Sequence, residues 1–158
     1  MPFSDWDLRK AAKIPGALEH FEGFATRFLQ ETMECIRNEH ENRIEGHFPI
    51  TQVIFIVNCK DFPLGQLLNL GAIRNIIALG TTYEAHYPEI MYKAILINVP
   101  SYFGIGIAAL KQVMAPKTMS KLCSYSTMAN WKKDMIEVLD PAILPERYGG
   151  TADVKKGI

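Results

Sequence analysis

The stretch AILINVPSYFGIGIAALKQVM, residues 94–114, holds a predicted strand followed directly by a predicted helix. Residues 94–98 form a short apolar run that ends just before Pro100, as is typical of a strand buried on both faces. Residues 103–114 carry a single charge, Lys111, and apolar side chains around most of the helical circumference. A strand followed by a helix is the repeating unit of a parallel sheet, so this stretch favours an α/β fold.

Longer helical segments alternate with short apolar runs on both sides of this stretch. The run Val53–Val57 is continuously apolar and largely β-branched, which predicts a strand covered on both faces. Pro88 and Pro116 are expected to end the helices before them, because proline lacks an N–H donor. The expected helices cover 17–41, 64–87, 103–114 and 128–139, and the expected strands cover 53–57, 94–98 and 121–125. This order predicts one α/β domain over residues 1–158, with a mostly parallel or mixed sheet flanked by helices.

Composition and charge limit the partners of this chain. The 158 residues contain 17 Lys and Arg and 17 Asp and Glu, so the whole chain has no electrostatic bias toward nucleic acid. Aromatic and basic residues do not interleave as they do on nucleic-acid surfaces. Three widely spaced cysteines suit a reducing compartment, and the charged N-terminus lacks the apolar core of a secretory signal. We therefore expect a cytoplasmic protein without a membrane span, since no apolar run reaches about 18 residues.

The sequence G-I-G-I-A-A at residues 104–109 matches the G-x-G-x-x-A pattern of a dinucleotide-binding turn. In such a turn the glycines link strand and helix directly, but here residues 100–103 intervene and are too bulky for a tight turn. The place of the ribose-binding carboxylate, about 20 residues further on, holds Ser124, Tyr125 and Ser126. We therefore reject nucleotide binding. The apolar segment is then either a plain core helix or a movable lid over an apolar cavity.

No catalytic or metal-binding pattern accompanies these elements. The four histidines are scattered, and none pairs with a carboxylate or a cysteine at metal-ligand spacing. The serines lack a G-x-S-x-G context, so a hydrolase triad has no nucleophile. Cys59 and Cys123 are interpreted as small apolar fillers at or within strands. The sequence thus predicts a protein that is not an enzyme and has no metal and no cofactor.

Several short motifs occur in a distinctive order along the chain. They are Tyr87-Pro88-Glu89, Ile95–Pro100, Ala115–Thr118, Asn130-Trp131 and Leu144–Thr151. Their order and spacing resemble the CRAL-TRIO lipid-binding domain, the family of the secretory-pathway phosphatidylinositol transfer protein and of tocopherol and retinaldehyde carriers. The resemblance extends from Trp6 to Thr151 and implies an apolar pocket floored by a sheet, holding one lipid and closed by a gating helix. Gly104 and Gly106 would then give that gate mobility.

The resemblance also implies where a phospholipid headgroup binds. By position, the headgroup would be contacted by Glu89, Thr118 and Lys121. A lysine ammonium and a threonine hydroxyl donate to phosphate, and a carboxylate accepts from inositol hydroxyls. Ile90 stands where the family often has an arginine, and Asn58 stands where it usually has an aspartate. The first departure removes a guanidinium donor, so phosphoinositide recognition is left open.

The gate and the pocket walls are expected among the apolar positions of the predicted elements. The gate residues are Phe103, Ile105, Ile107 and Leu110, and the pocket-wall candidates are Phe55, Ile73, Ile77 and Leu96. Which of these side chains point inward depends on strand register. A carrier must shield acyl chains from water at about 0.8 kcal/mol per CH₂, so its gate and sheet are expected to be rich in Ile, Leu, Phe and Met.

We expect this domain to bind one phospholipid, sterol or tocopherol-like lipid and to exchange or present it as a peripheral protein at membranes, with no nucleic-acid partner. The family's helical N-terminal domain and the first strand of its sheet have no counterpart here, so a fragment or a short isoform is expected. The resulting unfilled sheet edge favours homo-association. The alternative hypothesis is an interaction or scaffold domain that keeps the fold without carrying lipid.

Overall fold

The computed structural model describes residues 7–42 and 48–152. The helices are α1 (Leu8–Ala11), α2 (Ala17–Glu41), α3 (Leu64–Leu67), α4 (Leu70–His86), α5 (Gly104–Leu110), α6 (Pro116–Met119) and α7 (Met128–Val138). The strands are β1 (Val53–Asn58), β2 (Met91–Ile97) and β3 (Leu122–Ser124), and short 3₁₀ turns cover Ser101–Phe103 and Glu146–Tyr148.

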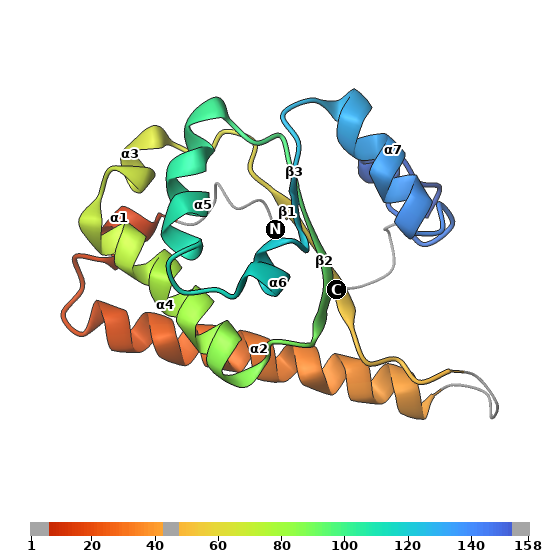
Figure 1. The fold of residues 1–158 in the computed structure, drawn as a ribbon, viewed down its shortest axis with the longest axis horizontal. Coiled ribbons are helices and arrows are strands. Elements are labelled where there is room, and N and C mark those ends of the chain that lie inside the picture. Colours follow the sequence, from red (N-terminus) through yellow and green to blue (C-terminus); the bar gives the residue numbers. More distant parts are fainter. Residues whose placement is uncertain (1–6, 43–47, 153–158) are drawn as a thin grey trace.

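The strands form a parallel sheet with β2 between β1 and β3. Ile56 of β1 pairs with Ile95 of β2, and Ala94 of β2 pairs with Leu122 of β3. Figure 1 shows α7 on one face of this sheet and α1, α3, α4, α5 and α6 on the other. This arrangement confirms the predicted α/β fold, a parallel sheet flanked by helices.

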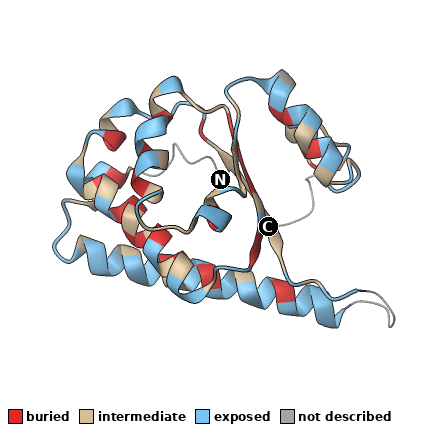
Figure 2. Cartoon of the chain, in the orientation of Figure 1, coloured by how far each residue is buried: buried red, intermediate tan, exposed pale blue. Residues whose placement is uncertain are grey.

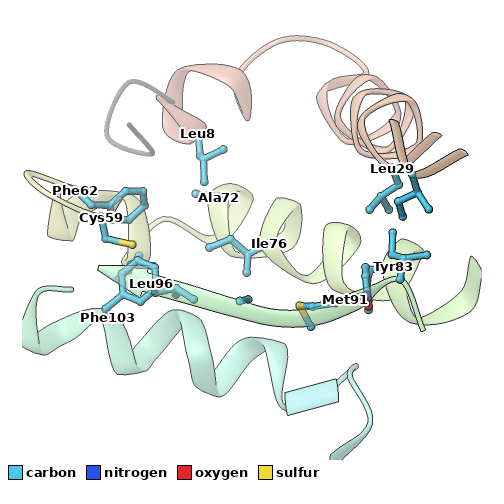
Figure 3. Close-up of a cluster of buried hydrophobic side chains, with 14 residues drawn as sticks. Leu8, Leu29, Cys59, Phe62, Ala72, Ile76, Tyr83, Met91, Leu96 and Phe103 are labelled. Atoms are coloured by element: carbon cyan, nitrogen blue, oxygen red, sulfur yellow. Dashed lines mark hydrogen bonds between the residues drawn. The ribbon is translucent and has the colours of Figure 1, made fainter. Parts of the chain in front are cut away.

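Side chains of β2 alternate between two apolar clusters, one on each face of the sheet. Ala94 and Leu96 join the larger cluster, whereas Ile95 and Ile97 join the smaller cluster together with Trp131 of α7. This alternation is the two-residue period of a strand. The larger cluster lies between the sheet and the helices of the other face (Figure 3). Buried residues gather where the helices meet the sheet, while most of α2 is exposed (Figure 2).

Strand β1 is covered on both faces, as the sequence predicts, but less completely than β2. Phe55 packs against the larger cluster and Ile56 against the smaller one. All six residues of Val53–Asn58 are nevertheless half-buried, whereas most of β2 is buried. The reason is the place of β1 at the edge of the described sheet, where β2 is its neighbour on one side.

Several helices begin or end at residues other than those predicted. The segment 64–87 forms two helices, because the chain is extended at Asn69, whose side-chain oxygen accepts from the Ala72 N–H at 3.1 Å and caps α4. Helix α5 ends earlier than predicted, at Leu110. Pro116 begins α6, since the first position of a helix needs no N–H donor.

The short helix α1 lies outside the predicted elements. Its cap is Asp7, whose Oδ1 accepts from the Lys10 N–H at 3.1 Å. Leu8 is buried in the larger cluster, and its N–H donates to Gln66 Oε1 at 2.9 Å. These contacts fasten α1 to the helices that cover the sheet.

Candidate functional site

Helix α5 follows β2 and packs one face against the larger apolar cluster. Phe103, Ile107 and Leu110 are spaced by four and three residues, so they lie on the same side. All three pack into the cluster, where the Phe103 ring meets the Phe62 ring edge to face, with 5.6 Å between centroids. Ile105 is 41% exposed. Only one side of α5 is therefore packed, although its sequence is apolar around most of its circumference.

The predicted pocket walls meet this packed side of α5. Phe55, Ile73 and Leu96 belong to the same apolar cluster as Phe103. Figure 3 shows Leu96 of β2 beside Phe103. Ile77, one turn after Ile73 in α4, is half-buried. The structure thus joins most of the predicted gate and wall residues in one cluster, with Ile105 and Ile77 outside it. Their contact with a lipid stays a prediction.

The segment after α5 approaches α4 closely at Gly80. A Cβ atom added to this buried glycine would lie 2.9 Å from Leu110 Cδ2 and 3.1 Å from Val113 Cγ2. Optimal contacts between carbon atoms are about 3.5–4.0 Å, so a larger residue would push these side chains away. The absence of a side chain at Gly80 therefore allows this close packing of α5 on α4.

A charged group lies at the turn between α4 and β2. Lys117 of α6 donates to Glu89 Oε1 at 2.7 Å, and Lys121 Nζ lies 3.8 Å from Glu89 Oε2. These three residues are called the Glu89 cluster below. Ile90 and Leu122, which follow Glu89 and Lys121 in the sequence, both pack in the larger apolar cluster. The Glu89 cluster therefore adjoins the apolar core.

Tyr83 holds the turn that carries Glu89. Its hydroxyl donates to the Pro88 carbonyl oxygen at 3.1 Å and accepts from the Met91 N–H at 3.2 Å. The Gln52 side chain donates to the Glu89 carbonyl oxygen at 3.0 Å and ties the turn to the segment before β1. Burial raises the pKa of the Tyr83 hydroxyl, which keeps it protonated as a donor. The turn that carries Glu89 is thus hydrogen-bonded both to Tyr83 of α4 and to Gln52 before β1.

The two lysines of the cluster shift the pKa of the Glu89 carboxyl. The hydrogen bond from Lys117, followed by the positive charge of the same lysine, lowers the pKa of the Glu89 carboxyl, and Lys121 lowers it further. The carboxylate is therefore ionised at neutral pH and is the counter-ion of both lysines. An anion entering this site must compete with Glu89 for the two ammonium groups.

The other residues of the predicted headgroup site lie in different surroundings. Thr118 is 3% exposed in α6, so its side chain is surrounded by protein. Ile90 is buried in the apolar core. Asn58 Oδ1 accepts from Asn98 Nδ2 at 3.0 Å, which joins the ends of β1 and β2. Of the predicted headgroup residues, the structure brings Glu89 and Lys121 together.

The sequence analysis missed Lys117. A signal was present, because Lys117 and Lys121 are four residues apart, the spacing of neighbours on one helix face, and Pro116 marks a helix start. The partner Glu89 is 28 residues away in the chain. The two segments meet because β2 and β3, which follow them, are paired in the sheet.

A second polar group lies on the face of the sheet covered by α7. Tyr125 donates to Asp134 Oδ2, and Lys93 Nζ lies 3.9 Å from the same oxygen. Burial, followed by the hydrogen bond to Asp134, raises the pKa of the Tyr125 hydroxyl. These contacts fasten α7 to the sheet. Across residues 7–42 and 48–152, no three His, Cys, Asp or Glu side chains gather as metal ligands.

The structure defines a class of protein: an α/β domain with an apolar helix packed over a parallel sheet and a charged cluster beside the apolar core. Residues 19–150 match the CRAL/TRIO domain. This match covers most of the sequence, so the chain belongs to the CRAL/TRIO domain family. The resemblance inferred from the ordered motifs is thereby confirmed.

The relatives of this chain are longer proteins. A CRAL-TRIO domain-containing protein of Caenorhabditis elegans is 35% identical over 65 residues, which cover 41% of this chain and 15% of that protein. The SEC14 cytosolic factor of Yarrowia lipolytica is 29% identical over 118 residues, covering 74% and 23% respectively. Patellin-6 of Arabidopsis thaliana is 28% identical over 101 residues, covering 64% and 23%. The chain thus spans less than a quarter of each of these relatives.

Proposed function

We propose that this chain is a non-catalytic domain that holds one lipid between α5 and the sheet and exchanges or presents it at a membrane. The observation that carries the proposal is the single apolar cluster formed by Phe103, Ile107 and Leu110 with Phe55 and Leu96 of the sheet. Membership of the CRAL/TRIO family supports a lipid as the ligand.

Movement of α5 gives the lipid access to the apolar cluster in this proposal. The helix has seven residues, begins at Gly104 and exposes one side, so its movement breaks the contacts of the packed side alone. Each CH₂ group of an acyl chain removed from water contributes about 0.8 kcal/mol. The side chains of Phe55 and Leu96 form the floor on which the acyl chains pack, with Ile73 and Ile77 of α4 beside them.

The headgroup end of the lipid is assigned to the Glu89 cluster, with Thr118 at its buried side. Lysine ammonium groups donate charge-assisted hydrogen bonds to phosphate oxygens. The position of the cluster supports the assignment, because Ile90 and Leu122 connect it directly to the apolar cluster. A phospholipid could therefore keep its acyl chains in the core and its phosphate at the surface.

The exposed side of α5 is assigned to the membrane. Gly104, Ile105 and Ala108 are exposed there and carry no charge, so the side facing solvent is apolar. None of the helices in the described part of the chain is both long and apolar enough to cross a bilayer. We assign the domain a peripheral position at the cytoplasmic surface of a membrane, with the apolar exposed side of α5 in contact with the lipids.

The edge of β1 is a second proposed contact, with another copy of the chain. Its side chains are half-buried and none is charged, and charged side chains are a common protection of sheet edges. Association is expected to raise the molar mass measured by light scattering as the protein concentration increases. A constant monomer mass would refute association through this edge.

Mass spectrometry of lipids extracted from the chain, purified from eukaryotic cells, tests the proposed function. We expect one dominant lipid at close to one molecule per chain. Ile107→Trp fills space between α5 and the sheet and is expected to lower the bound lipid. Ile136→Trp, at an exposed isoleucine of α7 on the other face of the sheet, is the matched control and leaves the lipid unchanged. A folded chain that carries no lipid would favour an interaction domain instead.

A further inference from the structure

Glu89 is shared by two lysines from different parts of the fold. Lys117 lies in α6 and contacts Oε1 at 2.7 Å, whereas Lys121 precedes β3 and approaches Oε2 at 3.8 Å. Two ammonium groups and one carboxylate leave the cluster with one excess positive charge. Each ammonium has three donors, so a single carboxylate leaves hydrogen-bonding capacity unused on both lysines.

The two lysines differ in how firmly the protein holds them. The Lys121 carbonyl accepts from the Ala94 N–H at 2.9 Å, and its side chain is 16% exposed. Lys117 lies in a one-turn helix, and its side chain is 73% exposed. Exposed ion pairs contribute little to the free energy of folding, so Lys117 can exchange Glu89 for another anion with little loss of stability. Lys121 is thus a fixed charge, and Lys117 is a mobile one.

We propose that Lys117 determines headgroup specificity, giving the site a preference for singly negative phosphodiester headgroups over zwitterionic ones. This inference rests on the proposed function and assigns the class of lipid that the same site takes. A singly negative phosphodiester neutralises the excess positive charge of the cluster. A zwitterionic headgroup brings a cation beside two lysines, where it is repelled.

Glu89 is, in this mechanism, the counter-ion that the phosphate displaces. It holds both lysines until a headgroup arrives, and the phosphate then competes with it for the same ammonium groups. Removal of the Glu89 charge therefore releases both lysines and strengthens the binding of an anionic headgroup. If Glu89 served only as an acceptor for headgroup hydroxyls, the same change would weaken binding, because an amide accepts less strongly than a carboxylate.

Competition binding with the full chain tests this inference. A fluorescent phospholipid bound to the chain is displaced by vesicles of phosphatidylinositol or of phosphatidylcholine. Lys117→Gln is expected to reduce the preference for phosphatidylinositol by about threefold to tenfold. Glu89→Gln is expected to raise the affinity for phosphatidylinositol. Lys133→Gln, at an exposed lysine of α7 on the other face of the sheet, is the matched control and changes neither value.

Water-soluble glycerophosphoinositol separates a lipid headgroup from a free phosphodiester. It carries the same anionic group without acyl chains, so it is expected to compete far more weakly than phosphatidylinositol in vesicles. Equal competition by the two compounds would assign the site to soluble phosphodiesters and overturn the lipid class proposed here.

The remaining outcomes distinguish the inference from the proposed function. An unchanged preference in Lys117→Gln overturns the inference while lipid binding itself stands. Weaker binding of phosphatidylinositol by Glu89→Gln does the same. If the unmodified chain binds neither vesicle lipid, the proposed function fails and the inference fails with it.

Discussion

Replacement of Gly80 by alanine tests how closely the gate segment, which comprises α5 and the residues up to Met114, packs on α4. The added Cβ would lie 2.9 Å from Leu110 Cδ2, 3.1 Å from Val113 Cγ2 and 3.4 Å from Met114 Cγ. The Leu110 methyl is the end of a flexible side chain and can turn aside, whereas the branched Val113 side chain has less freedom. The end of α5 and the residues after it must therefore shift outward to accept the methyl group.

The matched control is Gly23→Ala in α2. Gly23 is exposed, and an added Cβ meets nothing within 4 Å. Alanine is more favourable than glycine in a helix by about 1 kcal/mol, so this control is expected to raise the free energy of unfolding by that amount. Gly80→Ala gains the same helix contribution, but crowding opposes it by about 1–3 kcal/mol. The two variants should thus differ by about 1–3 kcal/mol, with Gly80→Ala the less stable.

Urea unfolding followed by circular dichroism measures both free energies. The m values should stay equal, because neither change alters the surface exposed on unfolding. The lipid exchange rate is the second readout, and Gly80→Ala is expected to exchange faster because its gate packs less well. If Gly80→Ala is stabilised as much as Gly23→Ala, the gate segment does not rest on α4 at this residue. The assignment of α5 as the gate then loses its structural basis.

Gly104→Ala, where an added Cβ meets nothing within 4 Å, should stiffen the start of α5 and slow lipid exchange, and faster exchange would contradict this. By NMR titration Glu89 should titrate below its usual value of about 4.3, and Lys117→Gln should move it back up. Because the folded-state pKa is lowered, the contribution of this pair to folding is present above the usual value and is lost as the pH falls through the lowered one. Alkylation should label exposed Cys35 in the folded chain but not Cys59, whose pKa burial raises to about 12; native labelling of Cys59 would show an open core.

The strands could be predicted from the sequence because parallel strands inside an α/β domain must be apolar. For this reason the run 53–57 lies within β1, and the run 94–98 overlaps β2 as far as Ile97. Because every position of these runs is apolar, the sequence does not show which side chains point to which face of the sheet. That Phe55 and Leu96 share the face of Phe103 became visible only through the pairing of the strands and the two clusters.

The candidate site could be predicted only in part, because its geometry depends on contacts distant in the chain. Glu89 and Lys121 were found by position in a motif, whereas their shared contact with Lys117 requires α6 to fold back on the α4–β2 turn. The break at Asn69 was hidden because Leu67, Leu70 and Ile73 keep a helical spacing across it, and the cap is recognised once the chain is seen to be extended there. Ile105 is exposed because α5 packs on one side only.

The proposed headgroup site and the proposed gate lie in neighbouring segments of the chain, so we expect their behaviour to be linked. Helix α5 ends at Leu110 and α6 begins at Pro116, so we expect a displacement of α5 to pull on Lys117 through the short connection between them. Lys121 stays with the sheet, because its carbonyl is hydrogen-bonded to Ala94. Glu89 therefore stands between a cation on the gate segment and a cation on the sheet. If a headgroup draws Lys117 away from Glu89, it biases the position of α5, and by reciprocity the position of α5 biases headgroup affinity. Because the Lys117–Glu89 pair is exposed, it shifts the position of α5 by only a small free energy, as suits a carrier that must both hold and release its lipid.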